Sequence, residues 1–88
     1  MKFKLYTHEH CPACKRMEPI YEKLAKDYPM EIVDPTTDAG QEQAWKDNIT
    51  SSPTLMILSD EGWTLNLILG LKRESEVWDI IERCKEME

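Results

Sequence analysis

Positive charge, long apolar runs and cysteine are all scarce in this sequence. Its 88 residues include 17 acidic and 11 basic side chains, a formal net charge of −6. Such a balance disfavours nucleic acid as a partner, because phosphate binding needs clustered cations. No apolar run approaches the roughly 18–20 residues that cross a bilayer, so we expect no membrane partner either. Three cysteines, an odd number, are too few for a disulfide-stabilised scaffold.

The sequence also has no repeat, linker or low-complexity segment, and its length suits one domain. The start, Met1-Lys2-Phe3-Lys4, leads straight into a strand pattern. It shows neither the apolar region nor the small-residue cleavage site of a signal peptide. We therefore expect residues 1–88 to form a single monomeric domain in the cytoplasm.

Apolar periodicity predicts seven elements in the order strand, helix, strand, helix, strand, strand, helix. Their expected positions are residues 3–6, about 11–28, 30–33, 38 to about 47, 54–58, 63–69 and about 73 onward. The early alternation indicates a parallel strand–helix–strand unit, and the last two strands indicate a hairpin. We therefore predict an α/β fold with a four-stranded mixed sheet flanked by three helices, which lie on both of its faces.

Several side chains have expected structural roles. Pro19 should bend the first helix, and Asp38 together with Gln41 should form a capping box at the start of the second. Tyr6, near the end of the first strand, is a candidate border of the functional site. Five further side chains are expected to pack in the core or the hairpin: Ala44, Trp45, Trp63, Trp78 and Cys84.

Cys11-Pro12-Ala13-Cys14 is the motif that carries chemistry. Two thiols at this spacing, between a strand and a helix, indicate a redox dithiol. We expect Cys11 at the N-cap, where its sulfur can accept hydrogen bonds from the amides of Ala13 and Cys14. Because the helix N-terminus stabilises a thiolate, Cys11 is interpreted as the exposed attacking thiol and Cys14 as the resolving one.

Charged neighbours of the dithiol are expected to modulate it. His8 and His10 favour a thiolate when they are protonated, and Lys15 adds a fixed positive charge beside the motif. Glu9 and Glu18 act in the opposite direction. Which sign prevails is left open by the sequence.

These residues resemble the thioredoxin and glutaredoxin superfamily over nearly the whole chain. The Cys-Pro start is similar to glutaredoxins, whereas Lys15 and Pro19-Ile20 are similar to thioredoxins. Ser52-Pro53-Thr54 resembles the cis-proline segment of the superfamily. The resemblance implies a thioredoxin fold, a cis Ser52–Pro53 bond, a Pro53 that faces the dithiol and a Ser52 that contacts substrate. It also places Pro12, Ala13 and Gly70 in the substrate-binding surface.

The sequence departs from the superfamily pattern at several positions. His10 stands where thioredoxins have tryptophan, and Leu5 stands where they bury a carboxylate beneath the dithiol. The extra N-terminal strand and helix of ordinary thioredoxins are missing, which leaves a glutaredoxin-size core. Gly70-Leu71-Lys72-Arg73 has one glycine where glutaredoxins usually have a pair that helps to hold glutathione. Lys72 and Arg73 are candidates for binding its carboxylate, although a solvated helix start is the preferred interpretation.

The resulting hypothesis is an enzyme, a thiol–disulfide oxidoreductase that reduces protein disulfides through Cys11 and Cys14 without a bound cofactor. Its electron donor is a reductase of the thioredoxin-reductase type or glutathione. The alternatives are a glutathione-linked glutaredoxin, a disulfide oxidase or isomerase, and a non-catalytic binding module. A metal-binding protein is a further alternative, because the segment His8-Glu9-His10-Cys11 to Cys14 holds four possible His and Cys ligands in seven residues: His8, His10, Cys11 and Cys14.

Overall fold

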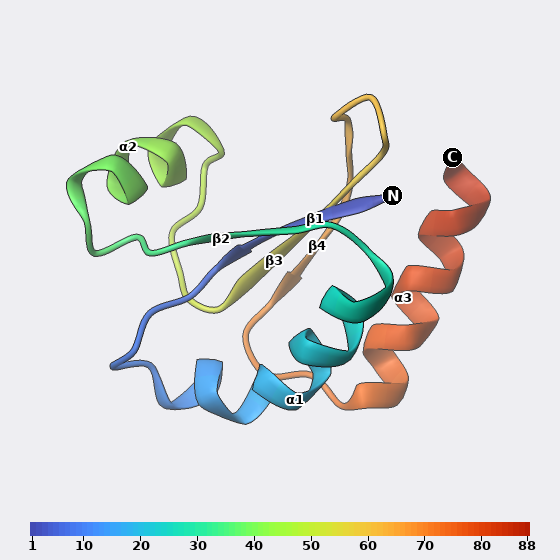
Figure 1. Cartoon of the computed structure of the whole chain (residues 1–88), viewed down its shortest axis with the longest axis horizontal. Coiled ribbons are helices and arrows are strands. Elements are labelled where there is room, and N and C mark those ends of the chain that lie inside the picture. Colours follow the sequence, from blue (N-terminus) through green and yellow to red (C-terminus); the bar gives the residue numbers. More distant parts are fainter.

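A four-stranded mixed sheet is the central layer of the computed structural model, which describes residues 1–88 (Figure 1). The chain order of the elements matches the prediction, and the strands lie in the order β2-β1-β3-β4. The elements are β1 (Lys2–Tyr6), α1 (Pro12–Asp27), β2 (Met30–Val33), α2 (Asp38–Lys46), β3 (Thr54–Leu58), β4 (Thr64–Leu69) and α3 (Glu74–Met87). This arrangement confirms the predicted thioredoxin fold.

The strand register brings four chain segments to one edge of the sheet. β1 pairs with β2 in parallel, with Tyr6 opposite Val33. It pairs with β3 in the antiparallel direction, with Tyr6 opposite Thr54, and Thr54 is in turn opposite Leu69 of β4. The ends of β1, β2 and β4 and the beginning of β3 therefore lie side by side at this edge.

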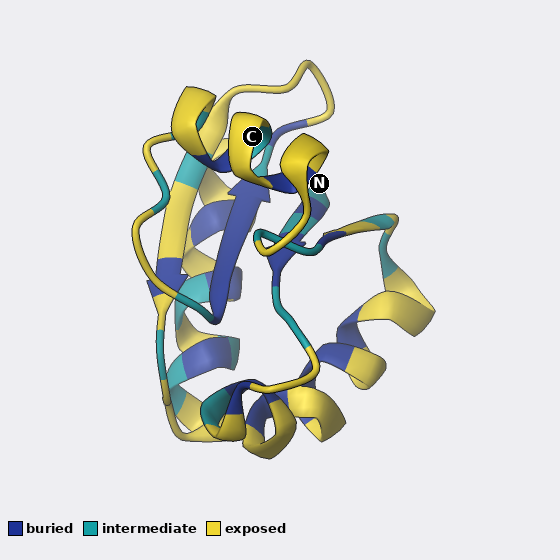
Figure 2. Cartoon of the chain, turned by 90° about the vertical axis from the view of Figure 1, so that its left-hand side faces the viewer, coloured by how far each residue is buried: buried dark blue, intermediate teal, exposed yellow.

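The larger core fills the space between one face of the sheet and the helices α1 and α3. Phe3 and Leu5 of β1 point into it, as the two-residue period of a strand requires. The apolar stripe of α1 and the buried face of α3 complete this core, and Figure 2 shows their buried side turned toward the sheet. Cys84 is fully buried in this core, which confirms its predicted packing role.

The smaller core lies on the opposite face, under α2. It consists of four buried residues, Tyr6, Val33, Ala44 and Met56. The Tyr6 hydroxyl donates a hydrogen bond to Asp47 at 2.5 Å, and Lys4 pairs with the same carboxylate at 2.9 Å. The Tyr6 side chain is thus committed to the α2 face, so its predicted place at the border of the site is wrong.

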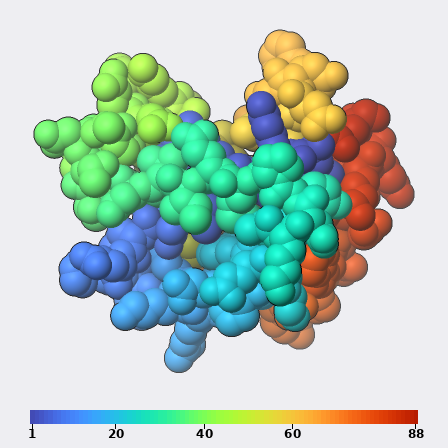
Figure 3. Space-filling model, viewed as in Figure 1, coloured from blue at the N-terminus to red at the C-terminus, as the bar shows by residue number.

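α2 covers only part of the sheet face that lies opposite α1 and α3. A hollow of about 500 Å³ lies beyond it, lined by residues that include Lys4, Asp47, Met56 and Leu58. In Figure 3 the green α2 segment and the yellow β3–β4 turn stand apart at the top of the molecule. None of the helices has the length and apolar character needed to cross a membrane.

Two local predictions about α2 are corrected by the structure. The N-cap is Thr37 rather than Asp38, because the Thr37 hydroxyl accepts a hydrogen bond from the Gly40 amide at 3.0 Å. Trp45 is 80% exposed instead of buried. Gly40 and Ala44, one helical turn apart, already fill the narrow contact with the sheet, so the next residue along the helix points away.

The other two tryptophans behave differently from each other. Trp63, in the turn before β4, is 74% exposed, so its predicted packing role is also wrong. Trp78 packs against the larger core, as predicted, and its indole N–H donates to Glu74 at 3.0 Å. A turn at the edge of a small sheet offers no second layer for Trp63, whereas Trp78 lies on a helix that faces the core.

Candidate active site

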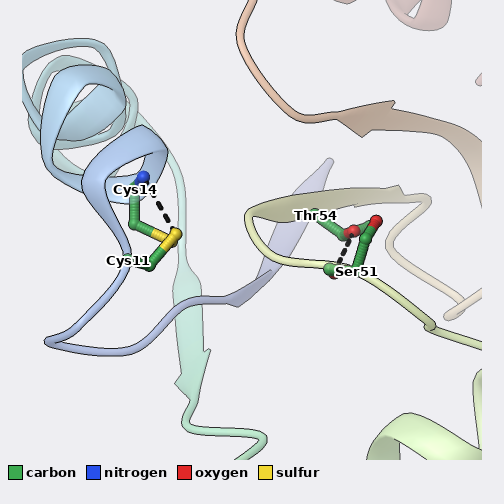
Figure 4. The surroundings of a disulfide bond; sticks show 4 residues. All are labelled: Cys11, Cys14, Ser51 and Thr54. Carbon is green, nitrogen blue, oxygen red and sulfur yellow. Dashed lines mark hydrogen bonds between the residues drawn. A yellow bond between two sulfur atoms is a disulfide. The ribbon is translucent and has the colours of Figure 1, made fainter.

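Cys11 and Cys14 form a disulfide at the N-terminus of α1 (Figure 4). Cys11 is the N-cap, with an extended backbone, and its sulfur accepts a hydrogen bond from the Cys14 amide at 3.1 Å. Its carbonyl accepts the first helical bond, from Lys15, at 3.2 Å. The predicted cap is confirmed, although the Cys14 amide alone donates to the sulfur. An N-cap side chain accepts from the amide two or three residues later, and here the contact is made with the third, Cys14, and not with Ala13.

The two cysteines differ in exposure, but less than predicted. Cys11 is 7% exposed and Cys14 is 2% exposed, so the expectation of an exposed Cys11 is wrong for this oxidised state. The closed disulfide holds the Cys11 sulfur against the first turn of the helix. Pro12 is exposed and Ala13 is half-buried, so the motif presents these two residues to the solvent.

The segment before β3 lies at the same edge of the sheet as the dithiol. Its Ser52–Pro53 peptide bond is cis, as the resemblance implied. Pro53 is buried, Ser52 is half-buried, and the Thr54 hydroxyl donates to the Ser51 carbonyl at 2.8 Å (Figure 4). This hydrogen bond closes the segment into a compact loop before β3.

Gly70 joins this arrangement from the end of β4. Its amide donates to the Pro53 carbonyl at 2.9 Å, and its φ of 68° is one that glycine adopts without strain. The strand register therefore places three segments with predicted site residues at one end of the sheet: the dithiol motif after β1, Ser52-Pro53 before β3 and Gly70 after β4.

An open hollow of about 600 Å³ borders Cys14. It is lined by Thr7, His8, Glu9, His10, Cys14, Lys15, Glu18, Ile32 and Asp34. His8 also lines an adjoining groove of about 430 Å³, together with Trp45, Ser51 and Ser52. The predicted modulating residues His10 and Lys15 thus lie at the same hollow, both exposed at the surface.

Hydrogen bonds shift the pKa of Asp34, which lines this hollow, and burial shifts the pKa of Tyr21 on α1. The Thr36 hydroxyl and amide donate to Asp34 and hold the pKa of that carboxyl below its usual value, with smaller contributions from His8 and His10. Burial raises the pKa of Tyr21, on the inner side of α1, to about 12. Glu9 and His10 lie 3.4 Å apart as an exposed pair.

The structure contains no group of three or more His, Cys, Asp or Glu side chains placed to hold a metal ion. His8 and His10 are adjacent to the motif in sequence, but they do not converge with the two sulfurs. Cys84, the third thiol, is buried in the larger core, where burial raises its pKa. The metal-site alternative therefore has no support in this geometry.

Several residues of the hollow and its groove were not predicted as site residues, among them Ile32, Asp34 and Trp45. Ile32 and Asp34 were detectable in principle. They lie at the end of a strand parallel to β1, and the carboxyl ends of parallel strands meet at one edge of a sheet. Trp45 gave no such signal, because its direction depends on how α2 docks.

Comparison with known proteins agrees with this geometry. Residues 4–83 match the family model described as Thioredoxin. A protein of Archaeoglobus fulgidus named "Probable Thioredoxin" is 33% identical over 84 residues, which cover 93% of this chain and 87% of that protein.

Two solved structures are similar as well. Thioredoxin 1 of Thermosipho africanus has a TM-score of 0.82 at 27% identity, and the match covers 99% of this chain and 97% of that one. The oxidised thioredoxin of Plasmodium falciparum has a TM-score of 0.72 at 31% identity, with 92% and 77% covered. With its disulfide at the start of α1, this chain belongs to the thioredoxin family of thiol–disulfide oxidoreductases.

Proposed function

We propose that this protein reduces disulfide bonds in other proteins by dithiol exchange through Cys11 and Cys14. The observation that carries the proposal is the position of the Cys11 sulfur. It caps α1 and accepts the Cys14 amide at 3.1 Å, where the helix N-terminus favours a thiolate over a thiol. Cys11 is also slightly less buried than Cys14, 7% against 2% exposed, which supports Cys11 as the thiol that meets a substrate.

The reaction then has two steps. The Cys11 thiolate attacks one sulfur of the substrate disulfide, forms a mixed disulfide and releases the other substrate sulfur as a thiolate. Cys14 loses its proton and attacks the Cys11 sulfur, which closes the Cys11–Cys14 disulfide and releases the second substrate thiol. The substrate disulfide gains two electrons, and the dithiol loses them.

The surface around the dithiol is suited to a polypeptide substrate. Pro12 and Ala13 face the solvent at the motif, and the half-buried Ser52 and Gly70 flank it from the opposing loops. We propose that substrate lies across these residues, with Pro53 fixing the loop from beneath. No bound cofactor is needed, because the electrons are carried by the two thiols, and we propose that the protein acts as a monomer.

For the electron donor we favour a reductase of the thioredoxin-reductase type over glutathione. Arg73 is a candidate for holding a glutathione carboxylate, but it pairs with Glu76 at 3.0 Å. That pairing leaves Lys72 as the one basic side chain of the Gly70–Arg73 segment without an ion pair. A glutathione-linked activity is therefore the second candidate.

Turnover of insulin disulfides tests the proposal. We expect wild-type protein to reduce insulin when recycled by a thioredoxin reductase with NADPH, and more slowly when recycled by glutathione. Cys11→Ser should lower both rates to background, because no nucleophile remains at the N-cap. Cys84→Ser is the matched control and should keep the wild-type rate, since that thiol is buried in the core. Equal turnover in Cys11→Ser and wild type would refute the proposal.

A further inference from the structure

β4 is an outer strand of the sheet, and one of its two edges pairs with no other strand. Its inner edge pairs with β3, and on this side the Gly70 amide, just past β4, donates to the Pro53 carbonyl at 2.9 Å. Residues of an antiparallel strand face the partner strand and the free side alternately. The backbone groups of Leu67 and Leu69 therefore point to the free side, where the Leu67 amide meets only the Asn66 side-chain oxygen, at 2.7 Å.

Exposed leucine side chains form an apolar row along this strand. Leu67 and Leu69 lie on the face of the sheet that carries the smaller core, because Leu67 is opposite Met56 of that core. The smaller core has no member from β4, and these two side chains remain 37% and 52% exposed. Leu71, just past the strand, is 51% exposed as well. Figure 2 shows the largely exposed β4 beside the buried β3.

The free edge of β4 lacks the usual protection of an outer strand. Exposed strand edges commonly carry charges or prolines that prevent pairing with another chain. Residues 62–71 contain neither a charged side chain nor a proline. β2, the other outer strand, has only four residues, carries Glu31 and lies between Pro29 and Pro35. Of the two outer strands, β4 is therefore the one that is open to an added strand.

We propose that the free edge of β4 binds an extended apolar segment of a polypeptide substrate as an added antiparallel strand, an inference that rests on the proposed dithiol function. The backbone groups of Leu67 and Leu69 supply the hydrogen bonds, and alternate side chains of the segment pack on the leucine row. The Asn66 side chain leaves the Leu67 amide when the segment binds. The preferred substrate class is a protein in which apolar, strand-forming residues lie next to the reducible disulfide.

The direction of β4 decides on which side of the substrate cysteine this segment lies. β4 ends at the same edge of the sheet as β1, from which the dithiol segment extends. An antiparallel partner, the commoner kind, begins at this edge and runs away from it. The substrate residues that pair with β4 therefore follow the cysteine in sequence. Their place is three strand spacings from β1, about 14 Å, which four to five extended residues span.

A second copy of this chain is the competing occupant of the edge. Each copy has a formal net charge of −6, so two copies repel each other, whereas a substrate segment of the stated chemistry is uncharged. Gly70, which belongs to the proposed substrate surface, directly follows the strand, so the edge and that surface are continuous. Both observations favour a substrate segment over a second copy.

Three cysteine peptides, each activated as a mixed disulfide with 5-thio-2-nitrobenzoate, test the proposal. One has about eight alternating valine and threonine residues after the cysteine, enough to reach the edge and pair with it. Another has the same segment before the cysteine, and the third has neither. The second-order rate constant of prereduced protein is measured for each peptide and for the small reagent 5,5′-dithiobis(2-nitrobenzoate). The variants are Leu67→Lys and Leu69→Lys, with Met87→Lys as the matched exposed change at the end of α3.

We expect the segment after the cysteine to raise the rate constant about tenfold, the effect of one or two net hydrogen bonds, and the segment before it less than about twofold. Both leucine variants should lose most of this gain and still react with the small reagent at the wild-type rate, whereas Met87→Lys should keep the gain. Backbone N-methylation of alternate residues should remove the gain for one of the two possible sets and not for the other, because only alternate amides face β4.

Equal gains from the two segments, a gain retained in both leucine variants, or a gain retained with both methylated sets would overturn the proposal. A wild-type dimer in sedimentation velocity that Leu67→Lys converts to a monomer would also overturn it, because the edge would then belong to a second copy. A wild type that fails to react with the small reagent would instead overturn the dithiol function on which the proposal rests.

Discussion

Cys11 ends an extended segment and Cys14 lies in the first turn of α1, so their sulfurs meet different backbone groups. The Cys11 sulfur receives an amide hydrogen bond that a negative sulfur strengthens, because charge-assisted bonds are roughly twice as strong as neutral ones. The Cys14 sulfur has no such donor among the hydrogen bonds of the site. The different roles proposed for the two thiols follow from this difference of one helical turn.

Tyr21 shows what burial without a partner does to a single residue. Its ring is 4% exposed in the larger core, and its hydroxyl has no hydrogen-bond partner. Burial opposes the charged phenolate and raises the pKa to about 12. An unfolded tyrosine ionises near pH 10, so the unfolded chain releases its proton first as the pH rises.

The stability of the fold should therefore fall between about pH 10 and about pH 12. Linkage assigns about 2–3 kcal/mol of this loss to Tyr21, and Tyr21→Phe should remove that part. Near pH 7 the same variant should unfold with a free energy within about 1 kcal/mol of wild type, because no hydrogen bond is lost. Urea unfolding across this pH range checks both statements.

Tyr28→Phe is the matched change at a half-buried tyrosine, and it should retain the alkaline loss due to Tyr21. An alkaline loss of the same size in Tyr21→Phe would contradict the account, as would a destabilisation well above 1 kcal/mol near pH 7.

At the scale of elements, the packing of α2 against the rest of the fold depends on one glycine, Gly40. Gly40 faces the backbone that follows β2, and a Cβ built on it would lie 1.7 Å from the Asp34 carbonyl oxygen. No side chain fits in that space without movement of the backbone. The close approach lets Ala44, one turn later, reach the smaller core.

Gly40→Ala should therefore destabilise the protein even though alanine favours a helix. Overpacking usually costs about 1–3 kcal/mol, and helix propensity returns about 1 kcal/mol, so we expect a net loss of up to about 2 kcal/mol in the free energy of unfolding. Gln41→Ala, an exposed change on the same helix, is the control and should alter stability by less than about 0.5 kcal/mol. If Gly40→Ala were as stable as wild type or more stable in urea unfolding, the space at Gly40 would not restrict the side chain at this position.

Elements with strong periodicity were predictable, and their docking details were not. β2 and β3 have their predicted bounds, because apolar runs between clear turn residues define them locally. Thr37 and Asp38 are both acceptable caps by residue type, and the choice depends on where Gly40 meets the Asp34 backbone. The apolar character of Trp45 predicts a core position, but the nine-residue helix α2 buries only Gly40 and Ala44 against the sheet.

At the scale of the whole molecule, the sheet register assembles the site. Tyr6 opposite Val33 and Thr54, and Thr54 opposite Leu69, align the ends from which the dithiol, Asp34, Pro53 and Gly70 extend. The dithiol was predictable from its own four residues, and the cis-proline segment from its resemblance to a family. The hollow beside Cys14 was not predictable in that way, because its walls come from three segments that only the register brings together.

The central claim is that Cys11 attacks and Cys14 resolves, and trapping the intermediate tests it most directly. Cys14→Ser is mixed with insulin, and the products are analysed by intact mass and peptide mapping without a reducing agent. The account predicts a covalent adduct of insulin on Cys11 through one of its disulfide sulfurs, released by dithiothreitol, and no adduct with Cys11→Ser. An adduct on Cys14 in Cys11→Ser, formed as readily as the adduct of Cys14→Ser, would contradict it.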